Sequence, residues 1–171
     1  MNSPVYIDRE QCRTDFECEE SELNDFIKKY ARQNHTNNIS KTYVVLDNNK
    51  VVAYYTLVYE NIELKDISNE IPSDLMQNRK DKIPCVLLGM LARDKKLKGQ
   101  DYGMYLLYEA IKKTYEASQI AGIKGLFLTP INERVAKKFY DKIEFLQKID
   151  ERLYYIPIAT IRALVKETEI G

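Results

Sequence analysis

The sequence predicts an α+β protein with a mixed sheet, and three observations lead to this prediction. β-rich runs and amphipathic helical stretches follow one another in the order β, α, β, β, β, α, β, α, β, with a further strand and helix able to follow. One run, 83–92, is apolar without alternation, which is typical of a strand buried on both faces. Six glycines and five prolines leave no visible interdomain linker, so we expect a single domain over residues 1–171.

The first part of the chain predicts a short strand around 5–7 and a helix over 21–33. Apolar residues recur along this helix at helical spacing, and they are Leu23, Phe26, Ile27, Tyr30 and Ala31. Ser21 stands where a capping residue is expected. This segment therefore predicts an amphipathic helix with one face against the core.

Two β-rich runs, 42–46 and 51–59, flank the turn-forming residues 47–50. We expect them to pair as an antiparallel hairpin. The polar stretch 61–82 is expected to be a long loop with a short helix near 73–78, and loops of this length are often functional.

Residues 83–92 are expected to form the central strand, and Gly89 within it indicates a bulge or the close approach of a ligand. A basic loop, 93–101, follows, and then a helix over 102–118 whose apolar residues share one face. The remaining elements predicted are a strand at 123–128, a helix at 132–142, strand-like runs around 145 and 153–156, and a short helix at 157–166.

Charge and residue counts exclude several classes of protein. Lys plus Arg and Asp plus Glu both number 26, so any contact with nucleic acid must come from a local basic face. Three cysteines without a Cys-x-x-Cys pair and a single histidine argue against a disulfide framework, a metal site and Ser-His-Asp chemistry. The N-terminus does not resemble a signal peptide and no apolar stretch is long enough to span a bilayer, so we expect a cytoplasmic protein that does not bind membranes.

The unit made of the central strand, the basic loop and the following helix is suited to bind an anion. Backbone N–H groups at a helix start are unpaired and carry the positive end of the helix dipole. A polyanionic cofactor is therefore expected at this helix start. The sequence lacks the phosphate-loop and dinucleotide-binding glycine patterns, which argues against ATP and NAD.

The segment KGQDYGMYLL resembles the acyl-CoA signature of GNAT acetyltransferases, Gln/Arg-x-x-Gly-x-Gly/Ala. Lys98 takes its first position, Asp101 stands where the first glycine is expected, and Gly103 takes the last. The resemblance implies the GNAT fold and acetyl-CoA as co-substrate. The cofactor contacts that it implies are Leu91, Ala92, Arg93, Lys98, Gly99, Gln100, Asp101, Tyr102, Gly103 and Met104.

A second GNAT motif, A-x-x-F-Y-x-x-x-G-F, is similar to the later segment AKKFYDKIEF, in which Glu144 replaces the glycine. The resemblance implies that Tyr140 donates a proton to the sulfur of CoA as the thioester breaks. It also implies a cofactor contact from Asn132, which lies eight residues before Tyr140 where the family asparagine lies seven before.

Four separated blocks of the chain resemble the TacT-like toxin acetyltransferases of type II toxin–antitoxin systems. They are FECEESELNDFIKKYARQNH, TYVVLDNNKVVAYYTL, PCVLLGMLARD and YYIPIATI. The resemblance implies that the substrate is the α-amino group of aminoacyl-tRNA, whose acetylation stops translation, and that a ribbon-helix-helix antitoxin is a partner. A homodimer is left open.

Three cations of the first predicted helix share its outward face when residues are spaced by about 100°, and they are the candidates for tRNA binding: Lys28, Lys29 and Arg32. Weaker candidates are Arg79, Lys80 and Arg93. The alternatives are an acetyltransferase for a small-molecule or protein amine and a non-catalytic module that only binds acyl-CoA, because fold alone does not determine function.

Overall fold

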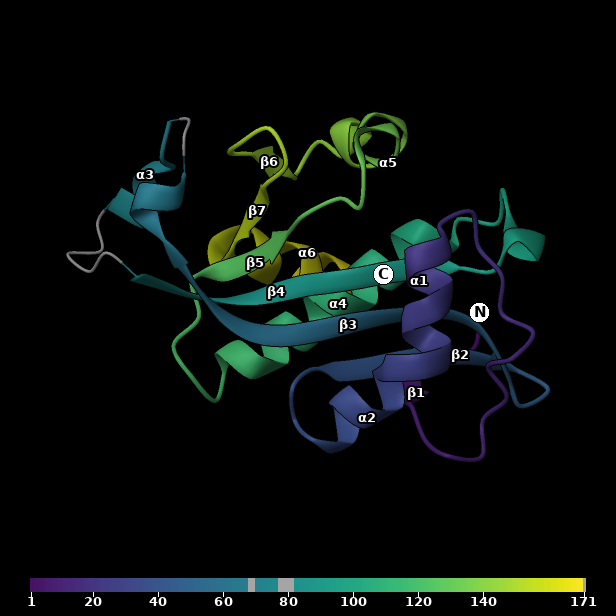
Figure 1. Ribbon diagram of the computed structural model, residues 1–171. Coiled ribbons are helices and arrows are strands. Elements are labelled where there is room, and N and C mark those ends of the chain that lie inside the picture. Colours follow the sequence, from purple (N-terminus) through teal and green to yellow (C-terminus); the bar gives the residue numbers. More distant parts are fainter. Residues whose placement is uncertain (68–69, 77–81, 171) are drawn as a thin grey trace. The chain divides into compact units, whose positions relative to one another are not determined.

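The computed structural model describes residues 1–67, 70–76 and 82–170 (Figure 1). Hydrogen-bonded neighbours give the strand order β1-β2-β3-β4-β5-β7-β6. The pairs β1–β2, β2–β3, β5–β7 and β6–β7 are antiparallel. Strand β4 (Lys82–Arg93) takes the fourth of seven places, which confirms the prediction of a central strand and of an α+β fold.

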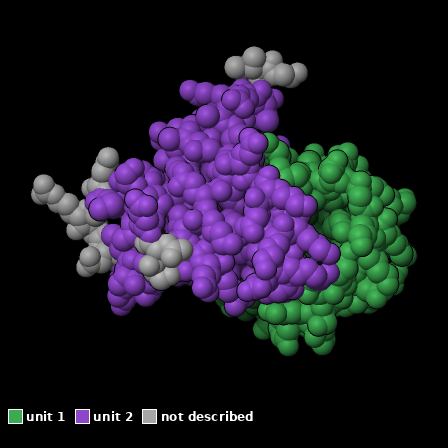
Figure 2. Space-filling model, turned by 90° about the horizontal axis from the view of Figure 1, so that it is seen from above, with its two compact units in different colours: residues 1–58, 88–110 green, residues 59–87, 111–171 purple. Residues whose placement is uncertain are grey.

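The chain divides into two compact units, one of residues 1–58 and 88–110 and the other of residues 59–87 and 111–171 (Figure 2). Strands β3 (Lys50–Glu63) and β4 and helix α4 (Tyr102–Ser118) contribute residues to both units. The expectation of a single domain stays a prediction.

The first unit contains β1 (Val5–Tyr6), β2 (Lys41–Asp47) and the adjoining parts of β3 and β4. The turn between β2 and β3 places Asn48 at φ +46° and Asn49 at φ +62°. Two successive left-handed residues are the backbone of a type I′ turn, which asparagine tolerates well. The predicted hairpin is therefore confirmed, with Lys41 opposite Leu57 and Asp47 opposite Lys50.

The predicted first helix is present and longer than expected. It runs through α1 (Ser21–Asp25), a π-helical segment (Phe26–Tyr30) and α2 (Ala31–Thr36), and it lies across the strands of its unit (Figure 1). Leu23, Ile27 and Ala31 are buried, as the spacing predicts, whereas Phe26 is only partly buried and Tyr30 is 55% exposed. The buried Tyr54 hydroxyl donates to the Leu23 carbonyl at 2.7 Å, which anchors the helix start on β3.

The assignment of Ser21 as the cap was wrong. Ser21 is already helical, and Glu20 holds the cap position with extended backbone and no side-chain hydrogen bond to the helix. The chain before the helix is held by Asn24 instead. The Asn24 side-chain amide accepts from the Cys18 N–H at 2.8 Å and donates to the Cys18 carbonyl at 3.2 Å. This tie fixes where the extended chain enters the helix.

The second unit contains α3 (Ser73–Met76), β5 (Gly125–Leu128), α5 (Glu133–Lys138), β6 (Gln147–Lys148), β7 (Tyr154–Pro157) and α6 (Ile158–Ile170). Its core includes Ile83, Phe127 and Tyr155. A Cβ on Gly125 would lie 2.3 Å from the carbonyl oxygen of Ile156, so only glycine fits where β5 meets β7. The Tyr155 hydroxyl donates to Asp74 at 2.6 Å, which ties α3 to β7.

The ends of several strands differ from the predictions. Strand β3 extends to Glu63, four residues beyond the predicted end, and a 3₁₀ turn (Leu64–Asp66) shortens the expected loop. Strand β5 begins at Gly125 and β6 at Gln147, two residues later than predicted in each case. In the part of the chain that the structure describes, no helix combines the length and apolar character needed to cross a membrane.

Candidate active site

Except for Asn132, the residues predicted to bind the cofactor form one continuous feature of the first unit: the end of β4, the basic loop and the start of α4. Gly99 has φ +80° and Asp101 has φ +54°. Asp101 is thus held in the left-handed region where the GNAT signature has glycine, a conformation that Asp adopts more readily than most residues. Nothing lies within 4 Å of the position of a Cβ on Gly99, so its surroundings are open.

Helix α4 begins directly after Asp101. The Tyr105 N–H donates to the Asp101 carbonyl at 3.0 Å, which is the first turn of the helix. The N–H groups of residues 102–104 precede the first intrahelical donor, and they carry the positive end of the dipole of a 17-residue helix. Residues 98–101 are exposed, so this end of the helix is open to an anion.

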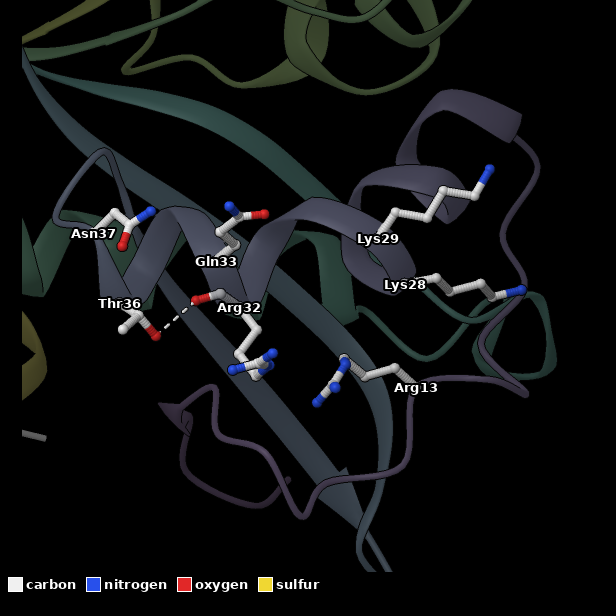
Figure 3. Close-up of a pocket in the computed structure, with 7 residues that line it drawn as sticks. All are labelled: Arg13, Lys28, Lys29, Arg32, Gln33, Thr36 and Asn37. Atoms are coloured by element: carbon white, nitrogen blue, oxygen red, sulfur yellow. Dashed lines mark hydrogen bonds between the residues drawn. The ribbon is translucent and has the colours of Figure 1, made fainter.

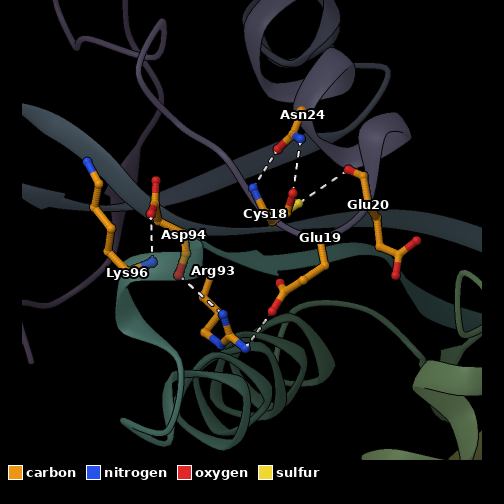
Figure 4. Close-up of polar contacts among 7 residues, drawn as sticks. All are labelled: Cys18, Glu19, Glu20, Asn24, Arg93, Asp94 and Lys96. Carbon is orange, nitrogen blue, oxygen red and sulfur yellow. Dashed lines mark hydrogen bonds and ion pairs between the residues drawn. The ribbon is translucent and has the colours of Figure 1, made fainter.

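The buried Asp94 carboxylate shapes the start of the basic loop, and sequence reasoning missed it. Asp94 is 5% exposed. Its Oδ1 accepts from the Lys96 N–H at 2.9 Å (Figure 4). Its Oδ2 accepts from the Glu17 N–H at 3.0 Å. The Glu17 carbonyl in turn accepts from the Lys95 N–H at 2.8 Å. In the sequence, the only indication of this role is that Asp94 lies two residues before Lys96, from whose N–H it accepts a hydrogen bond.

The Arg93 side chain forms an ion pair and a hydrogen bond within the protein. Its guanidinium lies 3.3 Å from the Glu19 carboxylate and donates to the Asp94 carbonyl at 3.2 Å (Figure 4). Gly89 also has an explanation within the protein, because its Cβ would lie 3.0 Å from Thr56 Oγ1. The Thr56 hydroxyl oxygen accepts a hydrogen bond from the Met90 N–H at 2.9 Å. Next to Gly89, the acceptor is therefore a side chain instead of a backbone carbonyl.

Tyr140 belongs to the second unit and is placed differently from the prediction. Helix α5 ends at Lys138, Phe139 departs from helical backbone, and Tyr140 begins a 3₁₀ turn (Tyr140–Lys142). The Tyr140 side chain is 6% exposed and packs against the rings of Phe139 and Tyr154, with centroids 4.8 and 5.9 Å away. Burial raises the pKa of Tyr140, and the neighbouring Tyr154 phenol adds to the rise. Tyr140 is therefore protonated at neutral pH.

A hydrogen bond fixes the turn that carries Tyr140. The Tyr154 hydroxyl on β7 donates to Asp141 Oδ1, and this bond holds the pKa of Asp141 below its usual value. Lys148 on β6 lies 3.4 Å from the same oxygen and 5.4 Å from the centre of the Tyr154 ring. The 3₁₀ turn is thus tied to both strands.

Replacing Tyr154 with phenylalanine is expected to lower the melting temperature by about 2–4 °C, because one partly buried hydrogen bond to a carboxylate is lost while the ring remains. Thermal unfolding followed by circular dichroism measures this change. Tyr59→Phe, at an exposed tyrosine of β3, is the control. Equal melting temperatures for the two variants would show that the Asp141 bond does not stabilise the turn.

Asn132 caps α5. Its Oδ1 accepts from the Val135 N–H at 2.9 Å, and its backbone is extended. The capping bond alone explains why asparagine occupies this position, and no ligand is needed to explain it. The predicted contact of Asn132 with the cofactor stays a prediction.

The three cations predicted to bind tRNA are exposed and line one pocket of the first unit, together with Arg13. Sequence reasoning missed Arg13 because it lies on the loop before α1, outside any periodic pattern. Arg79 and Lys80 lie outside the described residues. Within the described residues, no group of His, Cys, Asp and Glu side chains is arranged to hold a metal ion.

No protein-family model matches the chain. A tRNA-acetylating toxin of Mycobacterium tuberculosis is 29% identical over 132 residues, which are 77% of this chain and 76% of the toxin. The structure of AtaTR bound with acetyl-CoA is 30% identical, has a TM-score of 0.79, and covers 95% of this chain and 97% of its own.

Two further structures of AtaT are similar over almost the whole chain. AtaT complexed with acetyl-methionyl-tRNAfMet is 29% identical with a TM-score of 0.82, over 95% of this chain and 98% of AtaT. A tyrosine-to-phenylalanine mutant of AtaT bound to the C-terminus of the antitoxin AtaR is 28% identical with a TM-score of 0.80, over 96% and 97%. Together with the GNAT motifs around Asp101 and Tyr140, these similarities show that the chain belongs to the family of GNAT-fold toxin acetyltransferases that contains AtaT.

Proposed function

We propose that this protein is an acetyl-CoA-dependent N-acetyltransferase toxin that acetylates the α-amino group of aminoacyl-tRNA and thereby blocks translation. The observation that carries the proposal is the left-handed pair Gly99 and Asp101 at the open start of α4. This proposed anion site lies in a chain that is similar to a tRNA-acetylating toxin and to AtaTR bound with acetyl-CoA. The substrate is cytoplasmic, and so, we propose, is the enzyme.

The start of α4 is proposed to hold the pyrophosphate of CoA. The N–H groups of Tyr102, Gly103 and Met104 supply donors and the positive end of the dipole, and Lys98 adds a charge. Gly99 and Gln100 are exposed and adjoin these N–H groups in the sequence. The last three residues of β4, which precede the loop, are also proposed to contact the cofactor: Leu91, Ala92 and Arg93. Acetyl-CoA supplies the thioester when bound.

Tyr140 is proposed as the acid that delivers a proton from its hydroxyl to the departing sulfur. Burial raises the pKa of Tyr140, so the hydroxyl is protonated at neutral pH and is a weaker acid than a thiol. The transfer of its proton to the sulfur is therefore coupled to the breaking of the C–S bond. General acid catalysis of this kind is worth about 10²- to 10⁴-fold in rate. A dedicated base is not required for the acceptor, because an α-amino group has a pKa near 7.7 and is substantially neutral at pH 7 to 8.

The exposed helix face that carries Lys28, Lys29 and Arg32 is proposed to contact tRNA. A ribbon-helix-helix antitoxin is proposed as the protein partner, because a structure of the AtaT toxin holds the C-terminus of the antitoxin AtaR. Self-association into a homodimer remains a separate proposal that size-exclusion chromatography with light scattering tests.

Two measurements in sequence test the proposed function against its alternatives. Isothermal titration with acetyl-CoA first measures cofactor binding. Thiol release is then followed with charged tRNA, with uncharged tRNA and with a polyamine. Release with charged tRNA alone supports the proposal. Release with the polyamine alone identifies a small-molecule acetyltransferase, and binding without release on any amine identifies a module that only binds acyl-CoA.

Replacing Asp101 with glycine is expected to lower the KM for acetyl-CoA by about three- to tenfold, because a negative charge beside the pyrophosphate and a strained left-handed side chain are both removed. Asp101→Asn separates the two effects, since asparagine keeps the side chain and tolerates the same backbone. Steady-state kinetics over a range of acetyl-CoA concentrations measures both variants. An unchanged KM in both would place the pyrophosphate elsewhere.

A further inference from the structure

Two arginines face one another in the pocket on the first unit. The pocket has a volume of about 410 Å³, and its lining residues are Arg13, Lys28, Lys29, Arg32, Gln33, Thr36 and Asn37. Arg32 projects from α2, and Arg13 reaches toward it from the loop before α1 (Figure 3). Like charges held side by side repel, so this arrangement favours an anion between them.

Arg13 is held in place by the backbone of its own loop. Its Nη1 donates to the carbonyl of Asp8 at 2.7 Å and to that of Gln11 at 2.9 Å. Carbonyl oxygens fix the guanidinium without neutralising its charge. The side chain is therefore oriented before any ligand arrives, which lowers the entropy lost on binding.

Two acids near Arg13 in the sequence, Asp8 and Asp15, have other partners. Asp8 Oδ1 accepts from the N–H groups of Glu10 and Gln11 at 2.8 and 3.1 Å. Asp15 forms an ion pair with Lys50 at 2.8 Å. None of the ion pairs formed among the described residues involves Arg13.

The four cations of the pocket differ in their pairing. Lys29 pairs with Asp25 at 2.8 Å, and its side chain points away from Arg13 and Arg32 (Figure 3). Within the described part of the chain, Lys28 and Arg32 form no ion pair. The uncompensated charges of the pocket are thus those of Arg13, Lys28 and Arg32.

The chemistry of the lining favours a phosphodiester. The pocket contains four cations and no acid, whereas a second pocket, in the other unit, has three acids beside three cations. A guanidinium binds phosphate through two parallel hydrogen bonds. The amides of Gln33 and Asn37 can each donate and accept, which suits the 2′-hydroxyl groups that RNA carries beside its phosphates.

We propose that Arg13 and Arg32 bind one backbone phosphate of the tRNA between them, with Lys28 beside it. The proposal rests on the proposed function for the identity of the ligand. It adds a residue from outside the helix face to the tRNA contacts, and it makes Lys29 the least important of the four cations.

Binding of uncharged tRNA to the full chain tests the proposal, because uncharged tRNA needs no acceptor chemistry. Fluorescence anisotropy measures Kd between about 50 and 200 mM salt, where phosphate contacts are strongly salt-dependent. Arg13→Gln is expected to weaken binding by about 5- to 20-fold and to reduce the slope of log Kd against log salt by about one. Arg32→Gln is expected to do the same.

Arg9→Gln is the matched control, since Arg9 is an exposed arginine of the same loop that does not line the pocket. It is expected to change Kd by less than about twofold. Equal Kd values and slopes for Arg13→Gln and Arg9→Gln would overturn the proposal. Unchanged tRNA binding combined with weaker neutralisation by the antitoxin would also overturn it, because the pocket would then bind a protein carboxylate.

A structural role of Arg13 is separated from a binding role in two ways. Thermal unfolding shows whether Arg13→Gln folds, and Lys28→Gln and Arg32→Gln test the same pocket without disturbing the loop bonds. Failure of the proposed function would look different, since the wild-type protein would then bind tRNA through this pocket without acetylating charged tRNA.

Discussion

Tyr140→Phe is expected to lower the kcat for aminoacyl-tRNA acetylation by about 10²- to 10⁴-fold while the KM for acetyl-CoA stays within about twofold. Phenylalanine keeps the ring that packs against Phe139 and Tyr154, so the fold is retained. Only the proton donor is removed. Steady-state kinetics with charged tRNA measures the effect.

Tyr59→Phe is the control for Tyr140→Phe, because it removes an exposed hydroxyl from β3 and is expected to leave kcat unchanged. A normal kcat in Tyr140→Phe would remove this phenol from the mechanism. A loss of kcat accompanied by a large fall in melting temperature would instead assign Tyr140 a structural role, so unfolding is measured on the same samples.

Asp94→Ala is expected to lower the free energy of unfolding by about 2–4 kcal/mol, since the N–H groups of Glu17 and Lys96 lose a buried acceptor. The same change releases the start of the basic loop, so the KM for acetyl-CoA is expected to rise. Urea unfolding and acetyl-CoA kinetics measure the two effects.

Asp94→Asn is an intermediate case, because asparagine keeps one oxygen that can accept a hydrogen bond, whereas its NH₂ group can only donate. It is expected to lose about half of the free energy that Asp94→Ala loses. An alanine variant as stable as the wild type would show that Asp94 does not hold residue 17 against the loop. A destabilised variant with an unchanged KM would show that the shape of the loop does not depend on Asp94.

Elements with a strong local signal were predictable from the sequence. The two asparagines at 48 and 49 specify the hairpin turn, because few other residues adopt two left-handed conformations in succession. Helix α4 begins and ends where predicted, at Tyr102 and Ser118. Asp101 has a left-handed backbone, a conformation that suits a position where the GNAT signature has glycine and that Asp tolerates.

Features that depend on contacts between distant segments were not predictable. Asp94 accepts from a residue 77 positions earlier, and nothing near it in the sequence indicates that partner. The periodic apolar pattern continues through Tyr140, yet α5 ends at Lys138, and Tyr140 packs against Tyr154 from a separate turn. Arg13 joins the cationic pocket from a loop, where no periodicity marks it.

We propose that this chain moves an acetyl group onto the α-amino group of an amino acid attached to tRNA. Mass spectrometry of nuclease-digested charged tRNA, after reaction with acetyl-CoA, locates the group directly. We expect the aminoacyl-adenosine fragment to gain one acetyl group at its α-amino nitrogen with the wild-type protein and almost none with Tyr140→Phe. Acetyl-CoA turnover with no acetyl group on that fragment would contradict the claim.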